Sequence, residues 1–164
     1  MKDTIVKVFE NVDTKEEIEN IATISSIVWS FTYKDILSSN QIKYMLNKFL
    51  SFEAIKKQMD EGTTFTLLYN EAKVKMGFIA YSFDNDGIFL SKVYLLPNFQ
   101  HSGILNEIIK HLKVYNQSIT LTVNKHNINA IKAYEKYGFK RIKSIVTDIG
   151  EGYVMDDYVM KLEA

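Results

Sequence analysis

The sequence has no cysteine, and this absence removes several kinds of chemistry. Without cysteine the chain can form no disulfide bond, no thiolate metal ligand and no covalent thioester intermediate. The three histidines, His101, His111 and His126, lie on separate predicted elements without the spacing of metal ligands, so we expect no metal site.

Neither sign of charge is in excess, because Lys plus Arg and Asp plus Glu each total 20. This balance gives no electrostatic reason to expect a nucleic-acid or other polyanionic partner. Long apolar runs are also missing, so neither a signal peptide nor a membrane span is predicted. We therefore expect a cytoplasmic protein with no nucleic-acid or membrane partner.

Proline is almost absent as well, since Pro97 is the only one, and no Gly/Ser linker or repeat interrupts the chain. A length of 164 residues with 46% hydrophobic residues can bury a substantial core. We expect residues 1–164 to form a single domain.

Two capping boxes predict two helices in the first third of the chain: Thr14 with Glu17, and Ser38 with Gln41. Gly62 ends this helical region. Alternating and β-branched runs predict strands at 4–10, 63–70, 73–83, 87–96, 118–123, 139–147 and 153–162.

After Pro97 the apolar period returns to that of a helix, with one face formed by Ile104, Leu105, Ile108, Ile109, Leu112 and Tyr115. A short helix over 127–137 should stop at Gly138 in a C′ position. A helical crossover before 118–123 predicts that this strand is parallel to 87–96. The expected class is α/β (α+β): a mixed, mostly antiparallel sheet of about seven strands with about four helices, in the order β-α-α-β-β-β-α-β-α-β-β.

The turn QHSG comes directly before an amphipathic helix. The first amides of a helix have no intrahelical acceptor and lie at the positive end of the helix dipole, so they can bind phosphate oxygens. The amides from His101 to Asn106 could therefore hold a pyrophosphate, and Gly103 would allow close approach. An ordinary tight turn is the alternative interpretation.

In the strand before this turn, Ser91, Val93 and Leu95 point their backbone groups the same way. An extended ligand that carries amides could pair with them, although an ordinary central strand would look the same. On the short helix, Tyr134 lies two turns after Asn127. A phenol with an ordinary pKa of about 10 could donate a proton to a departing thiolate. The alternative is that Tyr134 is a core residue.

Taken together, KVYLLPNFQHSGIL and LTVNKHNINAIKAYEKYGFKR resemble the acetyl-CoA motifs of the GNAT superfamily of N-acetyltransferases. The resemblance covers residues 88–141 closely and implies a GNAT-like fold. It implies acetyl transfer from acetyl-CoA directly to a primary amine of a small molecule or peptide, in a ternary complex without a covalent enzyme intermediate. The stretch IVWSFTYKDILSSNQIKYML resembles the bacterial polyamine and diamine acetyltransferases more faintly.

The resemblance also implies roles for individual residues. Val93, Tyr94 and Leu95 would pair with the pantetheine arm, and Asn127 would contact the cofactor. Tyr134 would protonate its sulfur, between strands that splay apart near Leu96 and Val123. The pyrophosphate would be held by His101, Ser102, Gly103, Ile104, Leu105 and Asn106.

One position departs from the family pattern, which has Gly or Ala where this chain has Leu105. Its side chain either points into the core or crowds the cofactor, and its place in the apolar stripe favours the core. The departure keeps open a non-catalytic acyl-CoA-binding sensor or structural protein of the same fold. A binding domain without a cofactor is a third alternative, and a homodimer stays open as the assembly.

The proton acceptor and the acceptor amine are not assigned by the sequence. Asp35, Glu53, Asp84 and Asp86 fall in segments that could reach a cleft, and none of them is preferred. An aromatic group, Trp29, Phe31, Tyr33 and Tyr44, could contact a cationic amine or simply pack in the core.

Overall fold

The computed structural model describes residues 4–100 and 103–164. The strands are β1 (Val8–Asn11), β2 (Thr64–Tyr69), β3 (Lys75–Asp84), β4 (Gly87–Leu95), β5 (Ile119–Asn124), β6 (Lys140–Gly150) and β7 (Tyr153–Leu162). The helices are α1 (Lys15–Thr32), α2 (Ser39–Leu50), α3 (Phe52–Asp60), α4 (Ile104–Lys113) and α5 (Ile128–Lys136), with a 3₁₀ turn, η2 (Pro97–Phe99).

The seven strands form one sheet in the order β1-β2-β3-β4-β5-β7-β6. Every neighbouring pair is antiparallel except β4 and β5, which are parallel. The α4 crossover between these two strands accounts for their direction. The prediction of a mixed, mostly antiparallel sheet of seven strands is confirmed.

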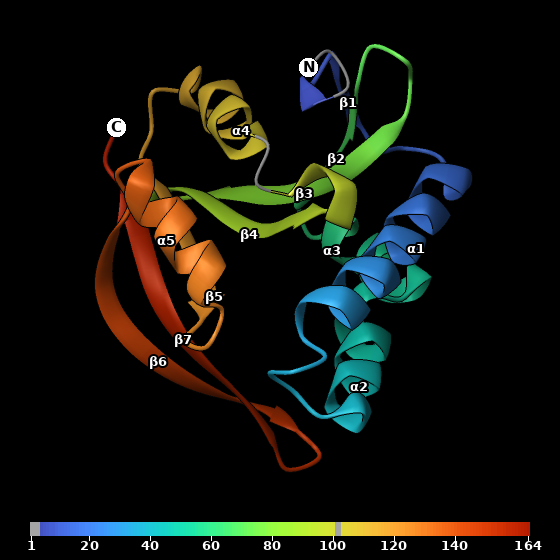
Figure 1. Ribbon diagram of the computed structural model, residues 1–164, viewed down its shortest axis with the longest axis vertical. Helices are drawn as coiled ribbons and strands as arrows, with labels where there is room; N and C mark the ends of the chain where they lie inside the picture. Colours follow the sequence, from blue (N-terminus) through green and yellow to red (C-terminus); the bar gives the residue numbers. More distant parts are fainter. Residues whose placement is uncertain (1–3, 101–102) are drawn as a thin grey trace.

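Helices cover both faces of the sheet (Figure 1). Helices α4 and α5 pack on one core, which contains Ile108, Leu112 and Ile131. Helices α1, α2 and α3 pack on a second core, which contains Ile21 and Met45. The strand pair β6–β7 curves away at one end of the molecule (Figure 1). The sheet thus has a layer of helices on each side.

The capping predictions are confirmed in part. At α1, Thr14 and Glu17 bond to each other's backbone in a complete capping box. At α2, the hydroxyl of Ser38 accepts from the amide of Gln41 at 3.1 Å, but the Gln41 side chain donates to the carbonyl of Val154 at 3.2 Å. The second box is therefore half formed, and its glutamine joins α2 to β7 instead.

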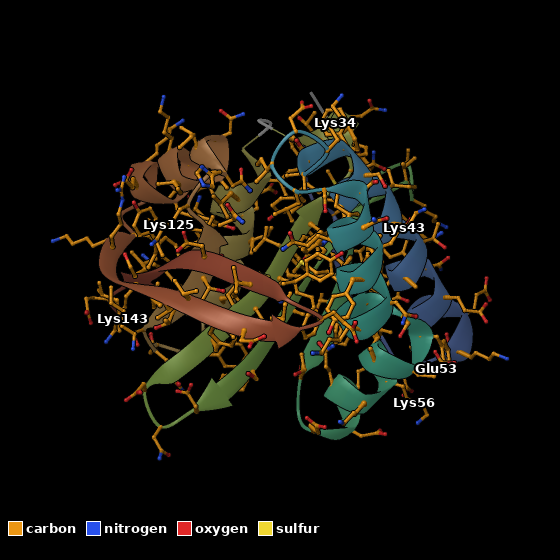
Figure 2. The ribbon with its side chains drawn as sticks, turned by 90° about the horizontal axis from the view of Figure 1, so that it is seen from below. Lys34, Lys43, Glu53, Lys56, Lys125 and Lys143 are labelled. Atoms are coloured by element: carbon orange, nitrogen blue, oxygen red, sulfur yellow. The ribbon has the colours of Figure 1, made fainter. Side chains whose placement is uncertain are left out.

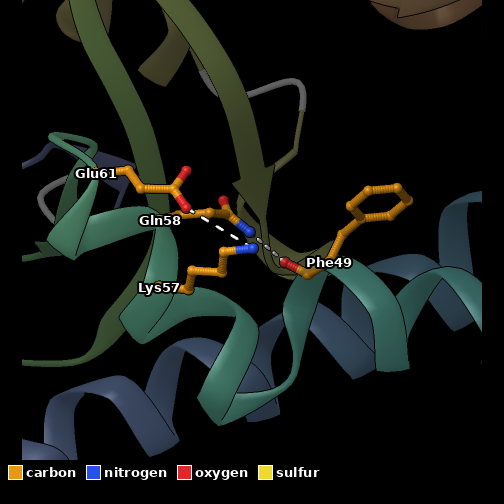
Figure 3. A network of polar contacts seen from close by, with 4 residues as sticks. All are labelled: Phe49, Lys57, Gln58 and Glu61. Atoms are coloured by element: carbon orange, nitrogen blue, oxygen red, sulfur yellow. Dashed lines mark hydrogen bonds and ion pairs between the residues drawn. The ribbon is translucent and has the colours of Figure 1, made fainter.

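The described residues form five α-helices where we expected about four. The difference lies at Ser51, whose extended backbone ends α2 and whose hydroxyl accepts from the amide of Ala54 at 3.3 Å to begin α3. Figure 3 shows how the two helices are joined: the Gln58 side chain donates to the carbonyl of Phe49 at 2.7 Å. A one-residue break with its own cap does not disturb the apolar period enough to be seen in the sequence.

The first strand is shorter than the predicted 4–10. Lys7 still donates its amide to the carbonyl of Tyr69, at 2.7 Å, but the amide of Val6 donates to the carboxylate of Glu107 on α4, at 3.1 Å. The chain before β1 is therefore held at Lys7 by β2 and at Val6 by helix α4.

Charged side chains are spread over the surface. Figure 2 shows Lys34 and Lys43 on the α1–α2 side of the molecule and Lys125 and Lys143 on the opposite side.

Within residues 4–100 and 103–164, no helix is both long and apolar enough to cross a membrane.

Candidate active site

Strands β4 and β5 pair only briefly before they separate. Their register contains two pairs, Ile88 with Ile119 and Phe89 with Thr120. Beyond these pairs β4 stays with β3, and β5 stays with β7. The sheet therefore opens into a gap after Phe89 (Figure 1). This gap agrees with the prediction that the two strands splay apart toward Leu96 and Val123.

A β-bulge lies where the gap begins. Ala80 pairs with Lys92 and Tyr81 pairs with Leu90, so Ser91 is an extra residue in β4. The Ser91 hydroxyl donates to the carbonyl of Ala80 at 3.2 Å. Because a bulge bends its strand and increases the local twist, it helps to turn β4 away from β5.

A cavity of about 830 Å³ fills the gap between the strands. Its walls come from the end of α1, from β4 and β5, from the beginning of α4, from α5 and from β7. Most of the predicted site residues line it: Val93, Tyr94, Leu95, Gly103, Ile104, Leu105, Asn127 and Tyr134. His101 and Ser102 lie outside the described residues. The structure thus brings together residues that are up to 41 positions apart, from Val93 to Tyr134.

The backbone of β4 has an open side toward this cavity. The amide of Leu96 donates to Met76 on β3 at 2.9 Å, so the backbone groups of Val93 and Leu95, which point the other way, face the gap. The carbonyl of Leu95 already accepts from the Gln100 side chain at 3.0 Å. Tyr94 turns its backbone toward β3, so it would meet a ligand through its side chain.

Helix α4 begins at the cavity with a residue in the left-handed region. Gly103 has φ +82° and is the N-cap, with no side chain to occupy the first amides. Space around it is open, because a Cβ built at this position meets nothing within 4 Å. The amide of Asn106 donates to the carbonyl of Gly103 at 3.2 Å, and Asn106 does not line the cavity.

Leu105, the departure from the family pattern, is half-buried. It packs against the core beneath α4, and it also forms part of the cavity wall. Its core contact is the outcome that the apolar stripe favoured.

Helix α5 supplies Asn127 and Tyr134. Asn127 is the N-cap, and its side chain accepts from the amide of Ala130 at 3.4 Å. Tyr134 is half-buried and packs edge-to-face on Phe139, with ring centroids 5.5 Å apart. Burial raises the pKa of Tyr134 above its usual range, and the neighbouring Tyr33 raises it further. Its phenol is therefore protonated at neutral pH.

Aromatic side chains from α1 and β4 form the opposite wall. Trp29 lies against Tyr33, with ring centroids 4.4 Å apart, and meets Tyr94 edge-to-face at 6.2 Å. Burial raises the pKa of Tyr33 and of Tyr94, so both phenols are also neutral. Of the aromatic group expected here, Trp29, Phe31 and Tyr33 line the cavity. Tyr44 does not, because its hydroxyl donates to the carbonyl of Ile149 on β6 at 2.5 Å.

Asp157 on β7 is the carboxylate that the sequence reasoning missed. Its side chain lines the cavity, the residue is 4% exposed, and its Oδ1 has no hydrogen-bond partner. Burial raises its pKa to about 6, with a further contribution from Asp156 that Lys125 partly offsets. Asp156 itself forms an ion pair with Lys125 at 2.7 Å. Asp157 thus stands at the cavity wall with one carboxylate oxygen unsatisfied.

A signal for this residue is present in the sequence. Two adjacent acids interrupt the apolar strand YVMDDYVM, and neighbouring side chains of a strand point to opposite faces. One of the two must therefore point inward. The acids that we considered instead, Asp35, Glu53, Asp84 and Asp86, do not line the cavity. Among the described residues, no three His, Asp or Glu side chains gather as metal ligands would.

A split sheet with a cavity between a strand edge and a helix N-terminus is the arrangement that the resemblance to the GNAT acetyltransferases implied. The family described as "Acetyltransferase (GNAT) domain" matches residues 33–161, which is most of the chain. The protein therefore belongs to the GNAT acetyltransferase family, whose members use acyl-CoA. The predictions of the family and of an N-acetyltransferase enzyme are confirmed.

Solved structures with the same fold include the PaiA N-acetyltransferase of Thermoplasma acidophilum, in complex with coenzyme A. It is 22% identical, covers 96% of this chain and 99% of its own, and has a TM-score of 0.72. The spermidine N-acetyltransferase of Vibrio cholerae, in complex with CoA and spermine, is 14% identical over 95% of this chain and 94% of its own, with a TM-score of 0.65.

YjaB from Escherichia coli, solved in its apo form, is 18% identical over 94% of this chain and 95% of its own, with a TM-score of 0.71. Among curated proteins there is no significant match. At these identities the three structures share the fold with this chain.

Proposed function

We propose that this protein transfers an acetyl group from acetyl-CoA directly to a primary amine while both substrates are bound. One observation carries the proposal: the gap between β4 and β5 places an open strand edge, a helix N-terminus, a protonated tyrosine and an unsatisfied carboxylate around one cavity. On this view, residues 1–164 act as a single acetyl-CoA-binding domain.

The open edge of β4 fits the pantetheine arm. Val93 and Leu95 direct backbone groups into the gap, where an extended ligand with amides can pair with them as a neighbouring strand would. The first amides of α4, from Gly103 to Leu105, would bind the pyrophosphate, since they lie at the positive end of the helix dipole. Open space around Gly103 leaves room for the phosphate oxygens.

Acetyl-CoA supplies an activated thioester carbonyl as the acetyl donor. Holding donor and amine together in one cavity removes most of the entropy cost of a bimolecular encounter. The amine nitrogen then attacks the carbonyl carbon, the C–S bond breaks, and the product is an amide and a thiol. No covalent intermediate on the protein is needed, in agreement with the absence of cysteine.

Tyr134 is suited to give the thiolate its proton. It lines the cavity, and its raised pKa keeps the phenol protonated until a strong base forms beside it. Tyr33 is its neighbour on the opposite wall. Asn127 lines the same cavity at the start of α5, where its side chain accepts from the amide of Ala130. We assign Asn127 to cofactor contact.

Asp157 is suited to accept the proton that the amine loses. An amine must be neutral to attack, and at physiological pH it arrives as an ammonium ion. With a pKa of about 6, Asp157 is ionised at neutral pH and yet more basic than an ordinary carboxylate. The proton passes to it directly or through one water molecule.

Two measurements test the proposal on the purified chain. Calorimetry with acetyl-CoA should show binding, and a thiol-reactive dye should show release of free CoA that depends on an added amine. Binding without any amine-dependent release would identify a non-catalytic acyl-CoA sensor, the alternative that half-buried Leu105 beside the cavity supports. Absence of binding would reject both functions.

A further inference from the structure

Asp157 is the only carboxylate among the described residues that line the cavity. Asp35, the nearest acid in sequence to the α1 wall, is exposed and lies outside the lining. Asp156 is turned to Lys125. The cavity therefore provides one buried negative charge, which can compensate one ammonium group.

The remaining charges of the lining are positive. Lys132 and Lys136 are exposed on α5. Lys92 also lines the cavity and is half-buried, and its amine donates to the Gln58 side chain at 2.6 Å and lies over the ring of Phe65 at 5.3 Å. A second ammonium group inside the cavity would meet cations and no further carboxylate.

The wall next to Asp157 is apolar and aromatic. It includes Trp29, Tyr33, Ile36 and Tyr94, with Met155 two residues before Asp157 on the same face of β7. We call these five residues the acceptor wall. Trp29 is 5% exposed and its ring is covered by those of Tyr33 and Tyr94, so little of its face is free to hold a cation. Such a wall suits a hydrocarbon or aromatic arm.

We propose that the acceptor is a monoamine whose single amino group is attached to an apolar or aromatic arm. We also propose that this cavity selects against diamines and polyamines. The inference rests on the proposed function. Its physical basis is that an ammonium group leaving water without a partner carboxylate loses its hydration without compensation. The spermine-bound relative from Vibrio cholerae thus shares the fold, whereas this chain differs in acceptor class.

A panel of matched amines tests the inference through the rate of CoA release by the purified chain. Butylamine and 1,4-diaminobutane differ by one amino group. The other two amines are 2-phenylethylamine, which has an aromatic arm, and spermidine, which has three amino groups. We expect kcat/KM for butylamine to exceed that for 1,4-diaminobutane by roughly tenfold or more, because the second ammonium lacks a partner. We also expect 2-phenylethylamine to be the best of the four.

A gain of function provides a second test. Ile36 lines the cavity and is half-buried, so Ile36→Glu would add a carboxylate to the acceptor wall, and Ile36→Gln is its neutral control. We expect Ile36→Glu to reduce the preference for butylamine over the diamine by about tenfold and Ile36→Gln to leave it unchanged. If Ile36→Glu does not fold, the ratio of kcat/KM for butylamine to that for 1,4-diaminobutane in the native chain still tests the inference.

The outcomes separate this inference from the proposed function. A higher kcat/KM for 1,4-diaminobutane or spermidine than for the monoamines would overturn the inference, while the proposed acetyltransferase function would still hold. Absence of turnover with every amine would overturn both. A preference for the monoamines that Ile36→Gln shifts as strongly as Ile36→Glu would show that the shape of the cavity, and not its charge, selects the acceptor, and would also overturn the inference.

Discussion

Asn124 and Asp157 lie directly opposite each other on β5 and β7, just where β4 has already left β5. Opposed residues of an antiparallel pair place their side chains on the same face. The oxygen of Asn124 nevertheless accepts from the amide of His126 at 2.8 Å, and Oδ1 of Asp157 is left without a partner. An unsatisfied carboxylate in a cavity wall costs stability, so its presence calls for a functional explanation.

Asp157→Asn should make the enzyme slower and the fold more stable. Loss of a general base typically lowers the rate by about 10²-fold or more. Because the native state holds a carboxylate whose pKa is raised from 3.8 to about 6, the neutral amide should increase the free energy of unfolding at pH 7 by up to about 3 kcal/mol. Steady-state CoA release and thermal unfolding measure the two effects.

The matched control is Asp156→Asn, next to it on β7. This substitution breaks a partly exposed ion pair with Lys125 and removes a charge that raises the pKa of Asp157. Asp157 stays ionised at neutral pH, so turnover at pH 7 should stay within about twofold. A purely structural role for Asp157 would instead lower stability and activity together in Asp157→Asn.

The pH dependence should contain a limb that belongs to Asp157. Its carboxylate must be ionised to accept a proton, so kcat/KM should rise as pH increases through about 6. The charged neighbours are Asp156, which raises this pKa, and Lys125, which lowers it, while Tyr33 and Tyr94 stay neutral. The ionisation of the amine adds a second limb at higher pH. Asp157→Asn should keep the amine limb and lose the one near pH 6.

Stability should change with pH in the opposite sense to activity. Between the ordinary pKa of 3.8 and the folded-state pKa of about 6, the native state binds more protons than the unfolded state. The contribution of Asp157 to the free energy of unfolding therefore falls as pH rises through this window. Comparison of urea unfolding at pH 5 and pH 7 in the native chain and in Asp157→Asn isolates this contribution; equal changes in both would contradict the assignment.

The sequence predicted the elements whose boundaries have local causes. Thr14 caps α1 with its own hydroxyl, and Gly138, with φ +99°, ends α5 in the C′ position as its residue type demands. The apolar period predicted the helix Ile104–Lys113, and the crossover rule predicted that β4 and β5 are parallel. Each of these features depends on residues close together in the chain.

The part that could not be predicted depends on contacts between distant segments. Asp157 becomes part of the site because β7 inserts between β5 and β6, an order that no local pattern indicates. Tyr33 reaches the cavity only because α1 ends above the gap. The extra residue Ser91 in β4 is defined by its partners on β3, so the bulge becomes visible only in the paired sheet.

Tyr134→Phe should lower kcat by about 10²-fold if the phenol protonates the thiolate as proposed, because the hydroxyl is lost while the ring is kept. The phenylalanine preserves the edge-to-face contact with Phe139, so the fold should be unaffected. Acetyl-CoA affinity, measured by calorimetry, should change by less than about twofold, since a lost acid alters the transition state and not uniform binding. Unchanged turnover would remove Tyr134 as the acid.

Gly103→Ala should weaken acetyl-CoA binding through the backbone alone. Gly103 has φ +82°, and alanine in the left-handed region costs about 1–2 kcal/mol, although its Cβ would meet nothing within 4 Å. The chain can relieve this strain by moving the first turn of α4, which displaces the amides assigned to the pyrophosphate. Gly152→Ala is the matched control, because Gly152 has φ +79° and equally open surroundings in the β6–β7 turn. Both variants should lose similar stability, and only Gly103→Ala should lose cofactor affinity; equal affinities in calorimetry would place the pyrophosphate elsewhere.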